Sequence, residues 1–357
     1  MLSDITDATQ IHSRARGYKP TELIYMTWNL TTTCNYTCRY CPEELHDGKW
    51  GFLDYDKALN FFRSLKNQLP KKCYITTELL GGEPTMWPKL LPFLSEVREL
   101  FLEGDQKIMM MLDTNLSRTA RWWQKLKDAD LYDMTVINSS FHPDFCDPDL
   151  FYSNLEIISE KYQTNANMMA DPKHFWTVVD LMDRIRGKLP VDYCVKVLRP
   201  DLGSKRLIDG YTEEMLDYIR KEELGQHLYP RSKFDVPGEK VQWPLDVHSN
   251  NERVNWQAIL MKKQHKFLGW QCSAGSKRLY IQPNGDVYPC SRLIDVHITP
   301  TSRSFIEDGT GPNRKYIMGN INNGDVKIYD EYMPCPKTYC SCKMDVVCDK
   351  YKINTSV

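Results

Sequence analysis

Apolar runs and amphipathic segments alternate along residues 21–224 of the 357-residue chain. The apolar runs are short and typical of buried β-strands, and they cover residues 23–30, 72–80, 107–112, 134–140, 164–169 and 191–198. Apolar residues at helical spacing predict helices over residues 54–69, 89–102, 117–129, 148–161, 172–188 and 212–223. Strands that alternate with helices form parallel sheets, and a full eight-unit barrel needs a longer chain. The pattern therefore predicts an α/β fold with a partial (βα)6 barrel.

The alternation stops on both sides of this region. Residues 1–20 read as an irregular N-terminal arm, and residues 225–270 read as a linker or insertion with a short helix near residues 255–264. Residues 271–357 are rich in Cys, Gly, Asn and Asp, which indicates a small second domain. Within it, a Pro-Asn-Gly-Asp turn at residues 283–286 lies between two alternating runs and predicts a β-hairpin.

Composition narrows the class of protein. The chain is 41% hydrophobic and 26% charged with a formal net charge of −1, which is typical of a soluble globular protein and gives no reason to expect nucleic acid or a membrane as a partner. The first residues are polar and form no secretory signal, and no apolar run reaches the length of a membrane span. The 12 cysteines are grouped near the two ends. This grouping, without a signal, predicts metal ligation in a cytoplasmic protein rather than disulfides.

Three cysteines, Cys34, Cys38 and Cys41, follow the first predicted strand at spacings of three and two residues. Thiolates gathered this closely select zinc or an iron–sulfur cluster. A structural zinc site needs four protein ligands, and no fourth cysteine or suitably placed histidine follows at once. Three thiolates on a four-iron cluster would leave one iron open as a reactive position. The alternatives are a zinc knuckle and a chance grouping of buried thiols.

With Tyr40 before Cys41, the group reads C-x3-C-x-aromatic-C and resembles the motif of the radical S-adenosylmethionine (SAM) superfamily. A Gly-Gly-Glu-Pro motif at residues 81–84 follows the second predicted strand, at the edge where parallel βα folds build their sites. Alone it reads as a turn, but at this distance from the cysteines it resembles the superfamily's SAM-binding loop. The resemblance implies a [4Fe-4S] cluster on the three cysteines, acceptance by Glu83 from the SAM amino group, and SAM contacts from Tyr40, Gly81, Gly82, Glu83 and Pro84.

Polar residues at the next two strand ends lie where the resemblance expects the SAM ribose and carboxylate. They are Asp113, Thr114 and Asn115 after the third strand, and Ser139 and Ser140 after the fourth. Asn115 and Ser140 are alternatively caps of the helices that follow them. His142, nearby, reads as a structural residue. Weaker candidates on the fifth predicted strand are Asn165 and Asn167.

Three cysteines lie outside both groups. Cys73 and Cys194 fall in predicted strands, where a buried cysteine is usually a small apolar filler. Cys146 follows the loop after the fourth strand. By resemblance to radical SAM epimerases it is a candidate hydrogen-atom donor, and its alternative role is also filler.

The C-terminal domain holds six more cysteines: Cys272, Cys290, Cys335, Cys340, Cys342 and Cys348. With its Asn-Gly-Asp-Val-Tyr-Pro-Cys hairpin and a Met-Gly-Asn-Ile segment at residues 318–321, this region resembles the SPASM/twitch extension of radical SAM enzymes. The resemblance implies at least one auxiliary [4Fe-4S] cluster, which would accept an electron or bind substrate. A second cluster stays open because the cysteine expected near residues 351–352 is absent, and zinc is the alternative on ligand type alone.

The resemblance implies that the chain cleaves SAM reductively to a 5′-deoxyadenosyl radical, which abstracts hydrogen from a substrate. Radical SAM proteins with such extensions mostly modify ribosomally made precursor peptides, and a minority act on aminoglycoside-type sugars. We therefore expect a peptide maturase of the epimerase, splicease or crosslinking type. The alternative is an aminoglycoside or amino-sugar dehydrogenase or epimerase. A third class is a non-enzymatic iron–sulfur electron carrier or scaffold. The motif that resembles a SAM-binding loop argues against this class.

The expected partners follow from the same resemblance. Only about 22 residues precede the first strand, so a fused winged-helix domain for leader recognition is not expected there. The partners are then a precursor peptide, a separate small leader-binding protein, and an electron donor such as flavodoxin or ferredoxin.

Overall fold

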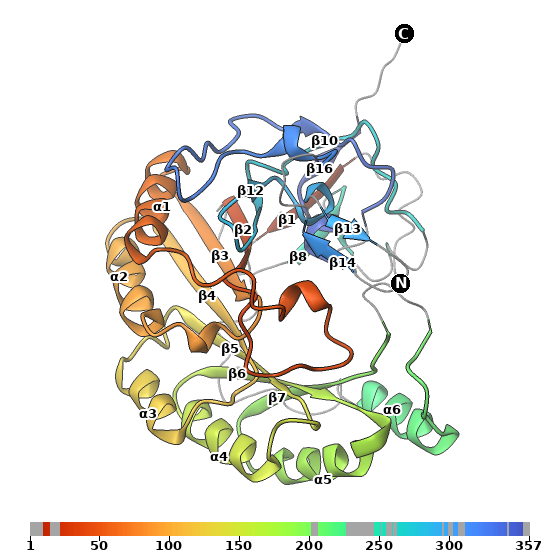
Figure 1. The fold of residues 1–357 in the computed structure, drawn as a ribbon. Coiled ribbons are helices and arrows are strands. Elements are labelled where there is room, and N and C mark those ends of the chain that lie inside the picture. The colour runs from red at the N-terminus through yellow and green to blue at the C-terminus, as the bar shows by residue number, and fades with distance from the viewer. Residues whose placement is uncertain are drawn as a thin grey trace.

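Six parallel strands lie side by side in chain order at the centre of the fold (Figure 1). The computed structural model describes residues 10–14, 22–200, 206–225, 246–250, 252–254, 259, 263–294, 296–298, 303–305, 311–340 and 343–352. The six strands are β2 (Glu22–Asn29), β3 (Cys73–Leu80), β4 (Gln106–Thr114), β5 (Thr135–Phe141), β6 (Gln163–Met169) and β7 (Val191–Lys196). Each pairs in parallel with the next, which confirms the predicted βα units. All six therefore end at the same edge of the sheet.

Helices cover the outer side of this curved sheet (Figure 1). They are α1 (Tyr55–Gln68), α2 (Leu90–Leu102), α3 (Ala120–Asp128), α4 (Pro148–Ser159), α5 (Phe175–Ile185) and α6 (Glu213–Gly225). Trp28, fully buried near the end of β2, shows how they pack. Its ring centroid lies 5.9 Å from those of Phe61 and Phe62 on α1 and 6.1 Å from that of Phe93 on α2. This aromatic cluster stabilises the strand from which the first cysteine loop departs.

The predicted C-terminal hairpin is present and extends the same sheet beyond β2. Strand β11 (Arg278–Ile281) pairs in parallel with β2, and β12 (Val287–Tyr288) pairs antiparallel with β11. Gly285 in the turn has φ of +91°, and a Cβ there would lie 2.8 Å from side-chain atoms of Asn320 and Asn322. Main-chain hydrogen bonds therefore join the cysteine-rich region to the barrel.

A second sheet combines segments from both parts of the chain in the order β15-β10-β16-β1-β8-β9. These strands are β1 (Gln10–Arg14), β8 (Asp246–Ser249), β9 (Glu252–Val254), β10 (Gln271–Cys272), β15 (Met333–Pro334) and β16 (Lys350–Tyr351). Strand β1 lies in the arm predicted to be irregular, so that prediction is wrong for residues 10–14. Ile11 is the only apolar residue of β1, and its pairing partners β8 and β16 are far away in the sequence. A local hydrophobic pattern has no access to such pairing.

The remaining described elements are short. They are β13 (Val296–Ile298), β14 (Arg303–Phe305), α8 (Lys343–Val346), and the 3-10 turns η2 (Glu43–Leu45), η3 (Pro84–Met86), η4 (Pro172–His174), η5 (Ser291–Leu293) and η6 (Arg314–Tyr316). The helix predicted near residues 255–264 falls largely outside the described residues. The domain limits drawn from the sequence stay predictions. Within the described ranges, no helix has the length and apolarity needed to cross a membrane.

Candidate active site

The three cysteines of the first motif lie on the loop after β2, at the C-terminal edge of the parallel sheet. Cys38 is buried, and Cys34 and Cys41 are half-buried. Cys41 N donates to Cys38 O at 2.9 Å and closes the turn between them. Burial, followed by repulsion from the Cys38 and Cys34 thiolates, raises the pKa of Cys41 to about 12. Cys38 and Cys41 therefore lie on one tight turn of the loop.

The donor chemistry of the loop fits an iron–sulfur cluster. A closed structural zinc site takes four protein ligands, one more than the three cysteines of this loop. Thiols are soft ligands, and a four-iron cluster binds each thiolate through a different iron. Cys34, Cys38 and Cys41 would hold it.

The glycine motif at residues 81–84 packs directly against the start of the cysteine loop. Gly82 N donates to Thr31 O at 2.7 Å. A Cβ on Gly82 would lie 2.1 Å from Thr33 O and 3.0 Å from Cys34 N. Gly81 has φ of +125°, and a Cβ there would lie 2.4 Å from Thr31 O. Both positions require glycine because the backbone of the glycine motif touches the backbone of residues 31–34. This contact positions the first cysteine.

Glu83 is buried, and its carboxylate is hydrogen-bonded by its own chain. Oε1 accepts from Thr85 N at 3.1 Å and from Thr114 Oγ1 at 2.7 Å, and Oε2 accepts from Asn115 N at 2.7 Å. Burial raises the pKa of Glu83, and these hydrogen bonds oppose the rise. The carboxylate ties the glycine motif to the end of β4, and Pro84 starts η3 behind it. Acceptance from a SAM amino group stays a prediction.

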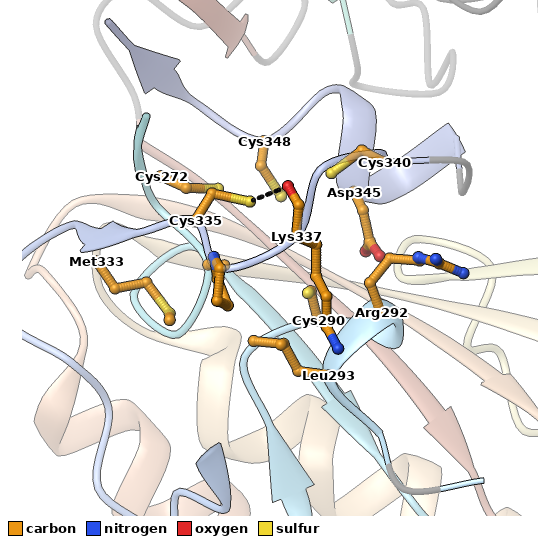
Figure 2. A pocket seen from close by; sticks show the side chains of 12 residues that line it. Cys272, Cys290, Arg292, Leu293, Met333, Cys335, Lys337, Cys340, Asp345 and Cys348 are labelled. Atoms are coloured by element: carbon orange, nitrogen blue, oxygen red, sulfur yellow. Dashed lines mark hydrogen bonds between the residues drawn. The ribbon is translucent and has the colours of Figure 1, made fainter. Parts of the chain in front are cut away.

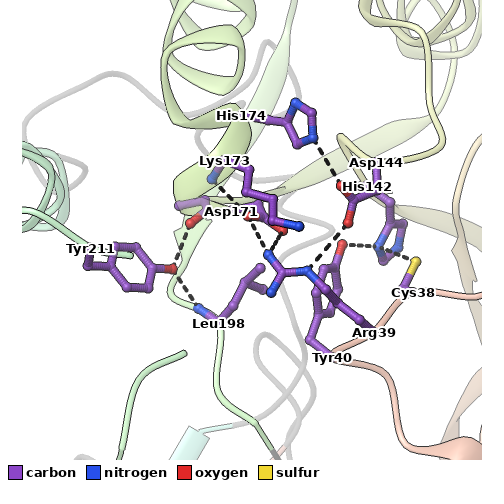
Figure 3. A network of polar contacts seen from close by, with 11 residues as sticks. Cys38, Arg39, Tyr40, His142, Asp144, Asp171, Lys173, His174, Leu198 and Tyr211 are labelled. Atoms are coloured by element: carbon purple, nitrogen blue, oxygen red, sulfur yellow. Dashed lines mark hydrogen bonds and ion pairs between the residues drawn. The ribbon is translucent and has the colours of Figure 1, made fainter. Parts of the chain in front are cut away.

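Two further contacts hold the cysteine loop. Asn115 Nδ2 donates to Asn35 Oδ1 at 3.0 Å. Arg39 Nη2 lies 2.7 and 2.6 Å from the two carboxylate oxygens of Asp171 (Figure 3). The Asp171 side chain is fully buried and also accepts from Lys173 N at 3.0 Å, at the start of η4. Asn115, predicted as a SAM contact, therefore has an observed role in joining two loops.

Tyr40 and His142 stack beside Cys38 (Figure 3). Their ring centroids lie 5.9 Å apart at an interplanar angle of 14°. His142 Nδ1 lies 2.9 Å from the Tyr40 hydroxyl and 3.5 Å from Cys38 Sγ. Burial lowers the pKa of His142 to about 4, so the ring is neutral at pH 7. The aromatic residue of the motif thus packs the cysteine loop onto the segment after β5, where His142 has the structural contacts predicted for it.

The inner face of the sheet carries a polar row of which the sequence interpretation named only Asp113 and Asn165. Asp113, Asn138, Asn165 and Asp192 are register partners on β4, β5, β6 and β7. Asn165 Nδ2 donates to Asn138 Oδ1 at 2.9 Å. Burial, followed by the charge of Glu78 on β3, raises the pKa of Asp113. The Asn-x-Asn alternation on β6 was the available signal, because a side-chain period of two places both amides on one face.

A second polar row lies nearer the C-terminal edge. Ser140, Asn167 and Cys194 are register partners, and Cys194 Sγ donates to Asn167 Oδ1 at 3.1 Å. Ser139 faces the helices instead, where its Oγ donates to Asn165 O at 2.9 Å. Of the two predicted serines, only Ser140 therefore presents its hydroxyl to the interior. The interpretation of Cys194 as filler is wrong, because strand alternation turns its half-buried thiol inward.

The other two lone thiols lie in the packed core. Cys73 is fully buried, as predicted. Cys146 is buried beneath Tyr36 of the cysteine loop, and its Sγ lies 3.7 Å from Asp147 O. Burial raises the pKa of Cys146 to about 11. It is therefore a protonated thiol at neutral pH, and its hydrogen-donor role stays a prediction.

Five C-terminal thiols line one cavity of about 350 Å³, part of it open to solvent (Figure 2). They are Cys272, Cys290, Cys335, Cys340 and Cys348, and all five are buried. Cys335 Sγ donates to Lys337 O at 3.6 Å, and Cys348 Sγ donates to Met344 O at 3.4 Å. Cys342 lies outside the described residues. This all-thiol donor set fits one auxiliary iron–sulfur cluster, and the structure brings together residues from four separate segments to form it.

Models of known protein families match the barrel region and part of the C-terminal cysteine region. Residues 28–197 match the model of the radical SAM superfamily. Residues 272–329 match the model of SPASM, an iron–sulfur cluster-binding domain. The search of curated proteins finds no match.

The search of solved structures finds matches of low sequence identity. A native anSMEcpe structure with bound AdoMet is 16% identical, with 85% of this chain and 83% of that chain covered and a TM-score of 0.47. SuiB from Streptococcus suis is 14% identical, with 76% and 61% covered and a TM-score of 0.44. BtrN in complex with AdoMet and 2-DOIA is 16% identical, with 85% and 80% covered and a TM-score of 0.35.

Proposed function

The chain is built from a radical SAM domain and a SPASM iron–sulfur cluster-binding domain, and we propose that it modifies a ribosomally made precursor peptide by hydrogen abstraction. The observation that carries this proposal is the trio of close thiols at the C-terminal edge of the sheet. When bound there, a reduced four-iron cluster supplies the electron that splits SAM into methionine and the 5′-deoxyadenosyl radical. The auxiliary thiol cavity adds a second redox centre.

The chain's own residues fix the position of the three thiols. The glycine motif holds the backbone before Cys34, Asn115 holds Asn35, and the Arg39–Asp171 pair holds the segment between Cys38 and Cys41. Contacts on three sides leave the loop little freedom to move. Such pre-organisation matters because a reacting atom displaced by about 1 Å loses roughly 100-fold in rate.

The inner polar rows are the proposed place of SAM and substrate. The Ser140 hydroxyl and Asn167 amide lie nearer the edge that carries the cysteine loop, and they suit the hydroxyl groups of a ribose. The deeper row from Asp113 to Asp192 would then face the substrate. A precursor peptide, a separate leader-binding protein and a flavodoxin or ferredoxin as electron donor belong to this proposal. The combination of the two domains supports the peptide substrate, because most radical SAM proteins with this extension modify peptides.

A second candidate substrate is an amino sugar of the aminoglycoside type. The deeper row favours it, since carboxylates at both ends and two amides between them match a compact molecule with amines and hydroxyl groups.

The reaction is tested with anaerobically reconstituted protein, SAM and dithionite. We expect release of 5′-deoxyadenosine, and release no greater than that of Cys38→Ala would contradict a radical SAM activity. Iron content near eight per chain would support one auxiliary cluster beside the first. Substrate class is tested by co-expression with each short peptide that a neighbouring reading frame is found to encode, followed by mass spectrometry of the peptides. An unchanged peptide together with turnover of an aminoglycoside would favour the second candidate.

A further inference from the structure

Lys350 is a buried cation beside the auxiliary cavity. Its side chain is fully enclosed, and Nζ donates to the main-chain oxygens of Asp345 at 2.8 Å, Val346 at 3.0 Å and Cys348 at 2.9 Å. Three acceptors use the three N–H groups of an ammonium, so the geometry itself requires the protonated form. The ring of Phe267 lies 4.6 Å from Nζ and completes the enclosure.

No carboxylate of the described residues forms an ion pair with Lys350. Asp345 offers Lys350 a main-chain oxygen. The Asp345 carboxylate accepts instead from Arg278 at 3.0 Å and from Ser291 at 2.7 Å. Arg278 and Asp345 are each 1% exposed and form a neutral pair of their own. A buried ammonium without a counter-charge is strongly disfavoured, so the site needs another source of negative charge.

The thiols provide that source. Lys350 on β16 is the register partner of Cys272 on β10, and it follows Cys348 by two residues. Directly opposite residues of an antiparallel pair have Cβ atoms about 4.5–5.5 Å apart on one face. Lys350 Nζ also donates to the main-chain oxygen of Cys348 at 2.9 Å. The cation is therefore placed beside residues that would hold the cluster.

We propose that the Lys350 ammonium is the built-in counter-charge of the auxiliary cluster and raises its reduction potential. Four thiolates give such a cluster a net negative charge, and reduction adds to it. A fixed cation in a poorly solvated site stabilises the reduced form more than the oxidised form. The result is a cluster that accepts an electron more readily. This inference rests on the auxiliary cluster of the proposed function and adds a positioning residue that is not a ligand.

The experiment measures the potential of the auxiliary cluster alone. A full-length background with Cys34→Ala, Cys38→Ala and Cys41→Ala is loaded anaerobically, and its iron content is determined. Midpoint potentials are then measured by redox titration followed by electron paramagnetic resonance. We expect Lys350→Met to lower the midpoint by at least the 59 mV that corresponds to a tenfold loss of electron affinity, and Lys350→Arg to restore it. Arg292→Met is the matched control, because Arg292 lines the same cavity but is exposed and screened by water.

A second variant keeps the test decisive if Lys350→Met holds no iron. Asp345→Asn removes a buried negative charge from the lining of the cavity, so the midpoint should rise. Opposite shifts in the two variants are not explained by loosened packing. Equal shifts in Lys350→Met and Arg292→Met, equal falls in Lys350→Met and Lys350→Arg, or no rise in Asp345→Asn would each overturn the inference. About four iron per chain in the background tests the auxiliary cluster of the proposed function separately, since that count does not depend on the potential.

Discussion

Replacing Gly82 by alanine tests whether the glycine motif positions the first cysteine. Gly82 does not have a left-handed backbone conformation, so the substitution acts through space alone. The added Cβ would lie 2.1 Å from Thr33 O, 2.5 Å from Thr33 C and 3.0 Å from Cys34 N. All three are backbone atoms, which have no flexible side chain to move aside. Either the cysteine loop or the glycine motif must shift.

The size of the shift follows from these distances. An ordinary contact begins near 3.4 Å, so the Thr33 oxygen and the new methyl group must separate by about 1.3 Å. That movement weakens the hydrogen bonds from Gly82 N to Thr31 O and from Glu83 N to Thr33 O, now 2.7 and 2.8 Å. Overpacking and two weakened hydrogen bonds together give an expected loss of about 2–4 kcal/mol in the free energy of unfolding. A thiol displaced by about 1 Å costs roughly 100-fold in the rate of SAM cleavage.

The assay compares Gly82→Ala with Gly51→Ala, since a Cβ on Gly51 meets no atom within 4 Å. We expect Gly82→Ala to hold less iron at the first cluster, to keep about four iron per chain in the auxiliary cavity, and to release 5′-deoxyadenosine at no more than about 1% of the normal rate. Gly51→Ala should match the unmodified protein in all three measurements. Full iron content and a rate within twofold of normal for Gly82→Ala would refute the role of this contact.

Three further substitutions test neighbouring contacts. Arg39→Met leaves the buried Asp171 carboxylate without its cation. It should lower the free energy of unfolding by about 1–3 kcal/mol in urea titrations and reduce SAM cleavage as well. Unchanged stability would show that the pair contributes nothing. Glu83→Gln replaces an acceptor of several hydrogen bonds and should destabilise the SAM-free protein by about 1–3 kcal/mol. If Glu83 served only to bind SAM, the substitution would change SAM affinity and leave the stability of the SAM-free protein unchanged. Burial raises the pKa of Tyr162 from 10.0 to about 12, so the unfolded chain loses this proton first and stability should fall from pH 10 to 12 by up to about 2.7 kcal/mol. Tyr162→Phe should lack this part of the fall, and an identical pH dependence in both proteins would argue against it.

The barrel was readable from the sequence because its strands and helices obey local rules. Strands β2 to β7 are buried on their outer face and appear as apolar runs, and α1 begins at Asp54, whose side chain accepts from Lys57 N as a helix cap. The cysteine spacings were readable for a related reason, since the ligands of one cluster on one loop must follow each other closely. Strand β1 was missed because its stability comes from pairing with residues more than 200 positions away.

The site predictions identified suitable residue types but not the direction in which each side chain points. Ser139 and Ser140 are the same residue type in adjacent positions, yet strand alternation turns one toward the helices and the other toward the interior. Asn138 and Asp192 were not singled out as site residues, and Asp113 was named only with the strand end that carries Asn115. Nothing local shows that four strands place these residues in one row. Alternation along one strand predicts the face of the sheet on which a side chain lies. Only the register between strands shows which side chains of different strands form one row.

The two glycines show a different limit. A glycine near a site indicates that another backbone or a ligand approaches its Cα atom closely. The sequence interpretation took SAM to be the approaching group. The structure places the backbone of the cysteine loop there, with Thr31 and Thr33 oxygens where the two Cβ atoms would be. The same logic applies to Lys350, whose position opposite Cys272 depends on a two-residue strand pair that no spacing predicts. In both cluster regions the cysteines are therefore visible in the sequence, whereas the groups that fix their position and balance their charge become visible only once distant segments are paired.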